Sequence, residues 1–193
     1  MEHSDSDLTN LSEQAMTSII NEHLELVKHF DFKELRNIVA PITNSGSIFL
    51  IGMGRSGLMM QAAAMRLMHL GFDAYVVGET TTPAIQEGDL LIAGSGSGTT
   101  ATVIRAAKTA KEVGAEVISF TTDKTSELAA LSTYVVHIPA AQKEAHNNTI
   151  SEQYAGSLFE QGLLLFFDAL IQTLWKVDGS SAETLYKRHS NLE

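Results

Sequence analysis

The chain contains no cysteine, which excludes a disulfide framework and thiolate chemistry and is compatible with a reducing compartment. Basic residues are also scarce: 13 Lys and Arg against 23 Asp and Glu give a net charge of −10. This charge repels nucleic acid and acidic membranes, so we expect neither as a partner. We find no signal peptide and no run near the roughly 20 apolar residues that span a bilayer, which predicts a cytoplasmic protein.

The 193 residues are 44% apolar and 19% charged, a composition typical of soluble globular proteins. We expect a single domain over residues 1–193. It would comprise an N-terminal helical segment at 1–45, an α/β core at 46–140 and C-terminal helices at 157–193. The His, Asp and Glu residues nowhere show metal-ligand spacing, so no metal is expected.

Apolar runs and helical patterns alternate through the middle of the chain. Strands are predicted at residues 47–51, 74–77, 89–93, 116–121 and 134–138. Helices are predicted at residues 8–30, 32–42 (ending near Pro41), 58–70, 100–113, 126–131 and 158–175. The short apolar runs without polar alternation indicate strands buried on both faces. We therefore predict a doubly wound α/β fold with a five-stranded parallel sheet in flavodoxin-like order and helices on both faces.

Two glycine-rich segments each follow a predicted strand and open a predicted helix: GMGRSG at 52–57 and GSGSGTT at 94–100. Glycine lets backbone N–H groups approach a ligand, and a helix N-terminus favours negative charge. In the flavodoxin-like order these segments follow neighbouring strands, at the crevice where ligands bind. We expect them to hold one phosphorylated polyol. The candidate ligands, which offer hydroxyl, guanidinium or backbone N–H donors, are Arg55, Ser56, Ser95, Gly96, Ser97, Gly98, Thr99 and Thr100.

Both glycine-rich segments also admit a second interpretation. Gly52, Gly54 and Gly57 match a dinucleotide-binding fingerprint, with Glu79 near the expected position downstream. The polar first loop, the competing hydroxyl-rich loop and the lack of a second domain argue against a dinucleotide site. The serines and threonines of the second segment could instead be turn and helix-capping residues, although four hydroxyls among three glycines exceed what capping requires.

Three further side chains are open to two interpretations each. Glu160 lies three residues after Ser157, and this spacing by itself favours a capping box, but a carboxylate at the start of so apolar a helix could instead be a general base. Glu79 is either a crevice carboxylate or a solvated strand end. His189 lies in the C-terminal tail. It is either part of a disordered end, or a side chain that supports the site residues or shuttles a proton.

The helix predicted at 158–175 is apolar on nearly every face. A helix of this kind is buried on all sides, and in so small a domain part of its surface is expected to meet another subunit. We therefore predict a symmetric homo-oligomer, a homotetramer built as a dimer of dimers.

With these residues identified, the chain resembles the sugar isomerase (SIS) domain family and, within it, the 6-phospho-3-hexuloisomerases. The segments that carry the resemblance are residues 52–59, 65–72, 77–79, 88–90, 94–98, 156–161 and 191–193. The chain departs from the family at 153–155, which reads Gln-Tyr-Ala where Gln-Pro-Met is common. It also has Thr99 where relatives often carry glutamate.

The resemblance implies isomerisation of D-arabino-hex-3-ulose 6-phosphate to D-fructose 6-phosphate in the ribulose monophosphate pathway of formaldehyde fixation. It implies Glu160 as proton acceptor, phosphate bound by Ser56 and the 95–100 loop, no cofactor, and 3-hexulose-6-phosphate synthase as functional partner. Two alternatives stay open: another sugar-phosphate isomerase, such as one acting on arabinose 5-phosphate, and a non-catalytic sugar-phosphate-binding regulator.

Overall fold

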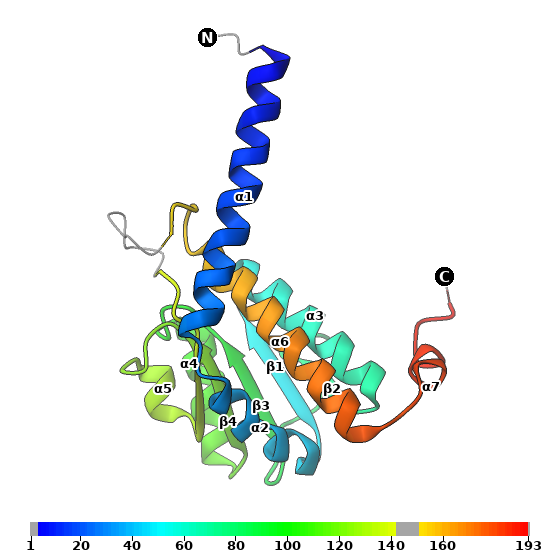
Figure 1. The fold of residues 1–193 in the computed structure, drawn as a ribbon. Helices are drawn as coiled ribbons and strands as arrows, with labels where there is room; N and C mark the ends of the chain where they lie inside the picture. Colours follow the sequence, from blue (N-terminus) through cyan, green and yellow to red (C-terminus); the bar gives the residue numbers. More distant parts are fainter. Residues whose placement is uncertain (1–3, 142–150, 193) are drawn as a thin grey trace.

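The computed structural model describes residues 4–141 and 151–192, and its centre is a parallel sheet of five strands. The strands are β1 (Ile48–Gly52), β2 (Ala74–Val76), β3 (Leu90–Gly94), β4 (Glu116–Thr121) and β5 (Tyr134–His137). Their order is β2-β1-β3-β4-β5, and every neighbouring pair is parallel. This is the predicted flavodoxin-like order, and the prediction of a doubly wound α/β fold is confirmed (Figure 1).

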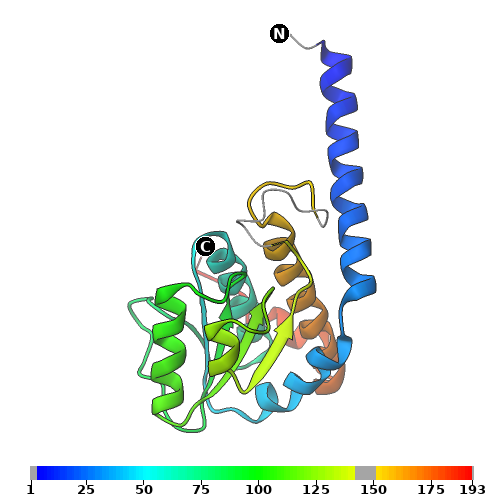
Figure 2. The same ribbon diagram turned by 90° about the vertical axis from the view of Figure 1, so that its left-hand side faces the viewer.

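Helices cover both faces of the sheet, because alternate residues of each buried strand point to opposite sides. Helices α2 (Phe32–Asn44), α3 (Gly54–Leu70) and α6 (Ser157–Asp178) pack on one face, around strand residues such as Leu50 and Ile92. Helices α4 (Ala101–Glu112) and α5 (Glu127–Leu131) pack on the other, around Ile51 and Leu91. The two layers lie on opposite sides of the sheet in Figure 2.

Two helices extend beyond this three-layer body. The C-terminal half of α1 (Asp5–His29) packs against α6, and its N-terminal half projects away from the sheet (Figures 1 and 2). The short helix α7 (Ala182–Tyr186) follows α6 and lies near the C-terminal end of α3. In the sequence, α1 and α2 precede the first strand, and α6 and α7 follow the last one.

Several predicted helix boundaries differ from the observed ones, and two of the differences have a clear physical meaning. Helix α3 begins at Gly54 rather than at residue 58, so the first glycine-rich segment forms the first turn of a helix and not an open loop. Helix α2 continues through Pro41 to Asn44. The buried side chains of Ile38 and Ile42 lie on either side of Pro41, and their packing stabilises the last turn more than the proline weakens it.

The expectation that no segment approaches a membrane span was too strict for α6. This 22-residue helix is long and apolar enough to cross a bilayer by length and composition, with a mean hydropathy of 1.2 over 18 residues. More than half of that window, 56%, is buried inside the protein, against α1, α3 and the sheet. Within the described residues α6 has the environment of a core helix.

Candidate functional site

The two glycine-rich segments leave the sheet side by side. Strands β1 and β3 are neighbours, and Gly52 pairs with Gly94 in their register. Both segments therefore begin side by side at the carboxyl ends of these two strands. Between them lies a cavity of about 70 Å³. Its lining comes from both glycine-rich segments, from Ala141 and from the start of α6. The lining residues are Met53, Ser56, Gly94, Ser95, Gly96, Ser97, Thr100, Ala141, Gly156 and Phe159.

Larger hollows lie elsewhere: about 910 Å³ beside α1, 340 Å³ beside α7 and 300 Å³ beside α4. Size therefore does not select the site. The small cavity is distinguished by convergent donors, because hydroxyls and helix-terminal N–H groups surround it on several sides. Such a set of neutral donors can hold an anion within an acidic protein.

The second segment is anchored to β4 and the residues that follow it. The N–H of Ser95 donates to the carbonyl of Phe120 over 3.0 Å. The carbonyl of Gly96 accepts hydrogen bonds from the hydroxyls of Thr121 and Thr122, at 3.1 and 2.9 Å. Sequence reasoning did not single out these threonines; their position at the end of a predicted central strand, beside the crevice, was the signal that could have found them.

Within the segment, the hydroxyls bond to one another rather than capping α4. Ser95 Oγ lies 3.1 Å from Thr100 Oγ1, and Thr99 Oγ1 donates to Ser97 Oγ over 3.1 Å. Thr100 occupies the N-cap position, but among the described residues its side chain makes no capping hydrogen bond. One of these residues therefore stands at the N-cap, as the capping interpretation expects, but its side chain does not form the capping hydrogen bond.

Glu160 lies in the first turn of α6 with only 3% of its surface exposed. Its Oε2 accepts a hydrogen bond from Arg55 Nη1 at 3.3 Å, and Arg55 belongs to the first turn of α3. The capping-box interpretation was wrong, because the N-cap is Gly156 and the Ser157 hydroxyl donates to the carbonyl of Tyr154. The buried carboxylate therefore lies between the N-terminal turns of α3 and α6, whose neighbouring residues Ser56 and Phe159 line the cavity, but Arg55 and Glu160 are not themselves among the lining residues.

The structure does not bring the other two candidates to this cavity within one chain. Glu79 is exposed in a turn after β2, where its carbonyl accepts from the N–H of Thr82. His189 stacks on His69 with ring centroids 3.8 Å apart. His69 is at the far end of α3 from Ser56, about 20 Å away at 1.5 Å per residue.

The fold and the cavity together define the class: a doubly wound α/β protein with a candidate anion site at the topological switch point of its sheet. The family model described as the SIS domain matches residues 41–159, which include both glycine-rich segments and every residue named above as lining the cavity. The chain belongs to the SIS domain family.

Similar proteins extend the likeness to nearly the whole chain. A 3-hexulose-6-phosphate isomerase from Mycobacterium gastri is 46% identical over 97% of this chain and 92% of its own. Another from Bacillus subtilis is 40% identical over 92% of this chain and 97% of its own. The crystal structure of a hypothetical protein from Methanococcus jannaschii superposes on this chain with a TM-score of 0.80. The two chains are 32% identical, and the match covers 93% of this chain and 99% of the other. That structure was described as inferring a molecular function of 3-hexulose-6-phosphate isomerase.

The exposed hydroxyl of Ser97 provides a test of the anion site. Replacing Ser97 with alanine should raise KM for a sugar phosphate about tenfold and change kcat little, because a remote phosphate is held alike in ground and transition states. Steady-state kinetics measures both. Ser45→Ala is the matched control, since Ser45 precedes β1 at the opposite edge of the sheet. A large fall in kcat at unchanged KM would contradict the assignment.

The contact between α3 and the C-terminal segment should weaken on acidification. Burial, helped by the nearby charges of His189 and Arg66, lowers the pKa of His69 below its usual value. The unfolded state then binds the proton more readily, so this contribution to stability is present above about pH 6.5 and is lost as the pH falls. We expect a lower melting temperature and altered fluorescence of Trp175, the single tryptophan, at pH 5.5 than at 7.5. An unchanged pH response in His69→Gln would contradict this origin.

Proposed function

We propose that the chain isomerises D-arabino-hex-3-ulose 6-phosphate to D-fructose 6-phosphate. The observation that carries the proposal is the buried carboxylate of Glu160, which directly follows Phe159 in a cavity lining rich in neutral donors; proton transfer on a phosphorylated sugar requires both a base and an anion site. The relatives named as 3-hexulose-6-phosphate isomerases support this choice of sugar, since they match this chain over most of its length.

The reaction moves a carbonyl from C3 to C2. Glu160 takes the proton from C2, and the electrons of that bond form a C2–C3 enediolate with the negative charge on O3. The hydroxyl proton of O2 passes to O3, and the protonated carboxyl returns its proton to C3 as the carbonyl forms at C2. We assign stabilisation of the developing oxyanion to Arg55, which contacts Glu160, and to the backbone N–H groups of the first turn of α3. The oxidation at C2 is balanced by reduction at C3 within one molecule, so the chemistry needs no redox cofactor.

The phosphate would be bound by Ser56 and the 95–100 segment. Binding energy from this remote group then holds C2 and C3 within reach of the carboxylate. Gly98 and Thr99 do not line the cavity; we assign Gly98 to the shape of the segment, and Thr99 to orientation of the Ser97 hydroxyl through its 3.1 Å hydrogen bond.

The test is a coupled assay. Purified protein is incubated with formaldehyde, ribulose 5-phosphate and 3-hexulose-6-phosphate synthase, which supplies the unstable hexulose, and fructose 6-phosphate is measured. Formation of fructose 6-phosphate that depends on this protein is the expected result. Interconversion of arabinose 5-phosphate and ribulose 5-phosphate would instead favour the alternative isomerase. Binding of sugar phosphate without turnover would favour a regulator.

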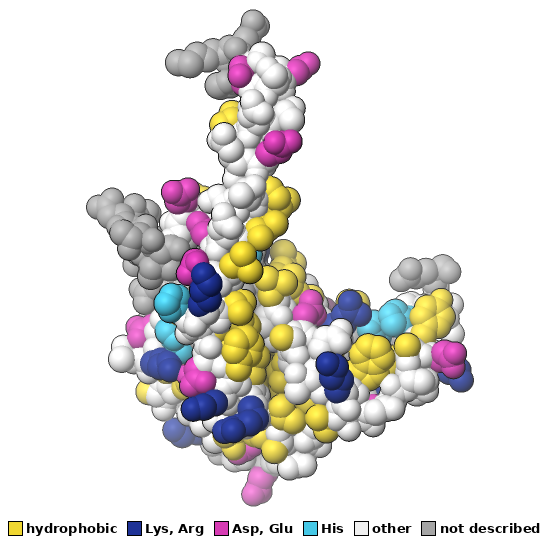
Figure 3. Space-filling model, in the orientation of Figure 1, with side chains coloured by type: hydrophobic (Ala, Val, Ile, Leu, Met, Phe, Trp, Pro, Cys, Tyr) yellow, Lys and Arg dark blue, Asp and Glu magenta, His cyan; other side chains and the backbone are white. Residues whose placement is uncertain are grey.

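We also propose that the chain acts as a cytoplasmic homotetramer. Most of α6 is covered by its own chain, so the apolar surface left for another subunit is mainly on α1 and α3 and less on α6 than its sequence suggests. On these three helices the exposed large apolar side chains are Leu8, Leu11, Met16, Ile20, Leu24 and Val27 on α1, Leu58, Met65 and Met68 on α3, and Leu165 and Val177 on α6. Figure 3 shows such side chains along α1 and the adjoining body.

Two separate helices that each present large apolar side chains suit a dimer of dimers, because every copy then offers two self-complementary surfaces. Light scattering at micromolar concentration should give four times the 20.9 kDa chain mass. Leu24→Glu should reduce that mass, because it places a charge on one of the surfaces. A monodisperse wild-type monomer would refute the proposal.

A further inference from the structure

The N-terminal helix α1 holds the segment that leads into α6 through a single carboxylate. One oxygen of Glu22 accepts hydrogen bonds from the Ser151 hydroxyl at 2.8 Å and the Gln153 amide at 2.7 Å, and the other accepts from the N–H of Glu152 at 2.8 Å. Partial burial raises the pKa of Glu22, but these bonds outweigh it and lower the pKa below its usual value. The carboxylate is therefore best suited to this place in its charged form.

The next residue of α1 reaches the first turns of α6 itself. His23 Nε2 lies 3.0 Å from Gln161 Oε1, and because an amide oxygen only accepts, the histidine is the donor. One turn further along α1, Leu26 packs on Gly162 so closely that a Cβ on the glycine would lie 2.8 Å from Leu26 Cδ2. These contacts are made with Gln161 and Gly162, the two residues that follow Glu160 in the sequence.

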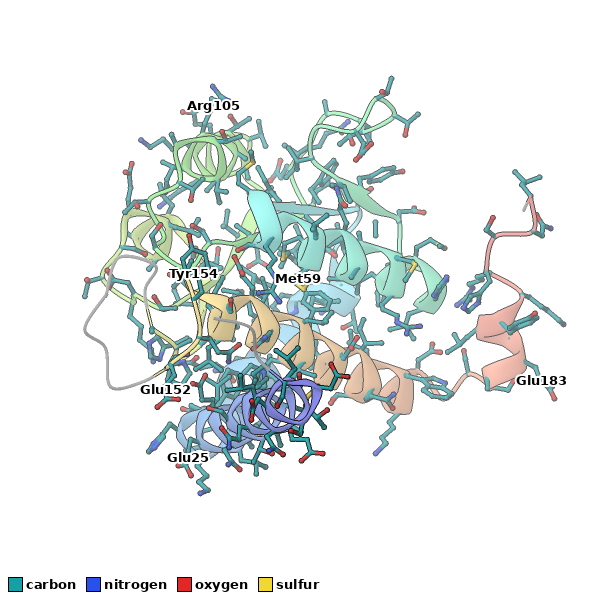
Figure 4. The ribbon with its side chains drawn as sticks, turned by 90° about the horizontal axis from the view of Figure 1, so that it is seen from above. Glu25, Met59, Arg105, Glu152, Tyr154 and Glu183 are labelled. Carbon is teal, nitrogen blue, oxygen red and sulfur yellow. The ribbon has the colours of Figure 1, made fainter. Side chains whose placement is uncertain are left out.

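The start of α6 has little local support of its own. Its N-cap Gly156 offers no side-chain hydrogen bond to the helix. The preceding Ala155 has φ +50°, a left-handed conformation that disfavours any residue with a Cβ. Figure 4 shows Glu152 beside α1 and Tyr154 near the beginning of α6. A strained, uncapped helix start keeps one orientation only when neighbouring structure fixes it.

We infer that Glu22 and His23 are positioning residues, which fix the first turn of α6 and thereby the place of Glu160 relative to the phosphate-binding segment. The inference rests on the proposed function of Glu160. Neither residue need touch substrate, and the phosphate-binding segment is anchored separately by Thr121 and Thr122. Loss of the α1 contacts should therefore affect proton transfer more than phosphate binding.

The first test compares Glu22→Gln with Glu25→Gln, a matched control one turn away whose carboxylate pairs with Lys28 on an exposed surface. Glutamine keeps the shape of Glu22 but turns an N–H₂ group toward one of its three donors. We expect kcat to fall about tenfold with KM within about twofold, because small misplacements of a reacting group cost rate rather than affinity. Amide hydrogen exchange in residues 151–163 should become faster. Glu25→Gln should change neither.

The second test uses the histidine. His23→Leu removes the donor to Gln161 and should lower kcat, whereas His23→Gln supplies an amide donor and should restore most of it. Rescue by the conservative variant distinguishes orientation of α6 from loss of packing volume, and it remains available if Glu22→Gln does not fold.

The outcomes separate the two claims. A wild-type protein that gives no fructose 6-phosphate overturns the proposed function. An active wild type whose Glu22→Gln variant has the kinetics and exchange of Glu25→Gln overturns the positioning role alone. A parallel loss of kcat and phosphate binding, with a lower melting temperature and no rescue by His23→Gln, also overturns it, since that pattern is general destabilisation.

Discussion

Glu160→Gln should lower kcat by about 10²–10⁴-fold, the usual contribution of general acid–base catalysis. Glutamine has the size of glutamate and can still accept the hydrogen bond from Arg55, but it cannot take a proton. Because Arg55 is half exposed, the variant leaves its guanidinium solvated, and the loss of stability should be about 1 kcal/mol or less. The measurement is the rate at which solvent deuterium enters C3 of fructose 6-phosphate.

Glu127→Gln is the matched control, because Glu127 also lies in the first turn of a helix and pairs with a cation, Lys108, at 2.8 Å. In the Glu127→Gln variant, both kcat and the rate of deuterium entry at C3 should equal those of the wild type. Exchange at the wild-type rate by folded Glu160→Gln would show that another group moves the proton.

Gly98→Ala should both destabilise the protein and abolish tight phosphate binding. Gly98 has φ +62°, which costs an L-residue about 1–2 kcal/mol, and a Cβ there would overlap the Ser126 side chain that caps α5. Overpacking of this kind adds about 1–3 kcal/mol. We expect the free energy of unfolding, measured by urea denaturation, to fall by both amounts together and KM to rise more than tenfold.

Gly78→Ala separates the two effects. Gly78 has φ +99°, but a Cβ there meets nothing within 4 Å, so only the backbone cost applies. It should lose less stability than Gly98→Ala and keep its KM. Equal losses in the two variants would show that the contact with Ser126 does not shape the segment.

The sheet could be predicted from sequence because its signals are local and redundant. Strands such as β3, buried along their whole length, read as uninterrupted apolar runs, and the glycine-rich segments mark where β1 and β3 end. Since the doubly wound orders are few, these two segments were enough to place the candidate phosphate site at one edge of the sheet.

The surroundings of Glu160 could not be predicted, because they depend on contacts between residues that lie far apart in the sequence. Arg55 is 105 residues from Glu160, and neither spacing nor charge pattern connects them. The capping-box spacing was misleading for a conformational reason: Gly156, with φ +77°, takes the N-cap position and places Ser157 inside the helix. The contacts of Glu22 with Glu152 and of His23 with Gln161 join residues 130 and 138 positions apart and have no sequence signature.

Apart from Ser56 and Arg55, which are neighbours on α3, the groups proposed to bind the phosphate and the group proposed to move the proton come from different parts of the chain. The phosphate-binding segment is built on β3 and β4, and the carboxylate stands on α6, held from outside by α1. Selection can thus alter one without rebuilding the other. A new acid or base on α6, or a shift in how α1 supports it, would redirect the fold toward other phosphorylated sugars, and loss of the carboxylate would leave a receptor that binds its sugar phosphate unchanged.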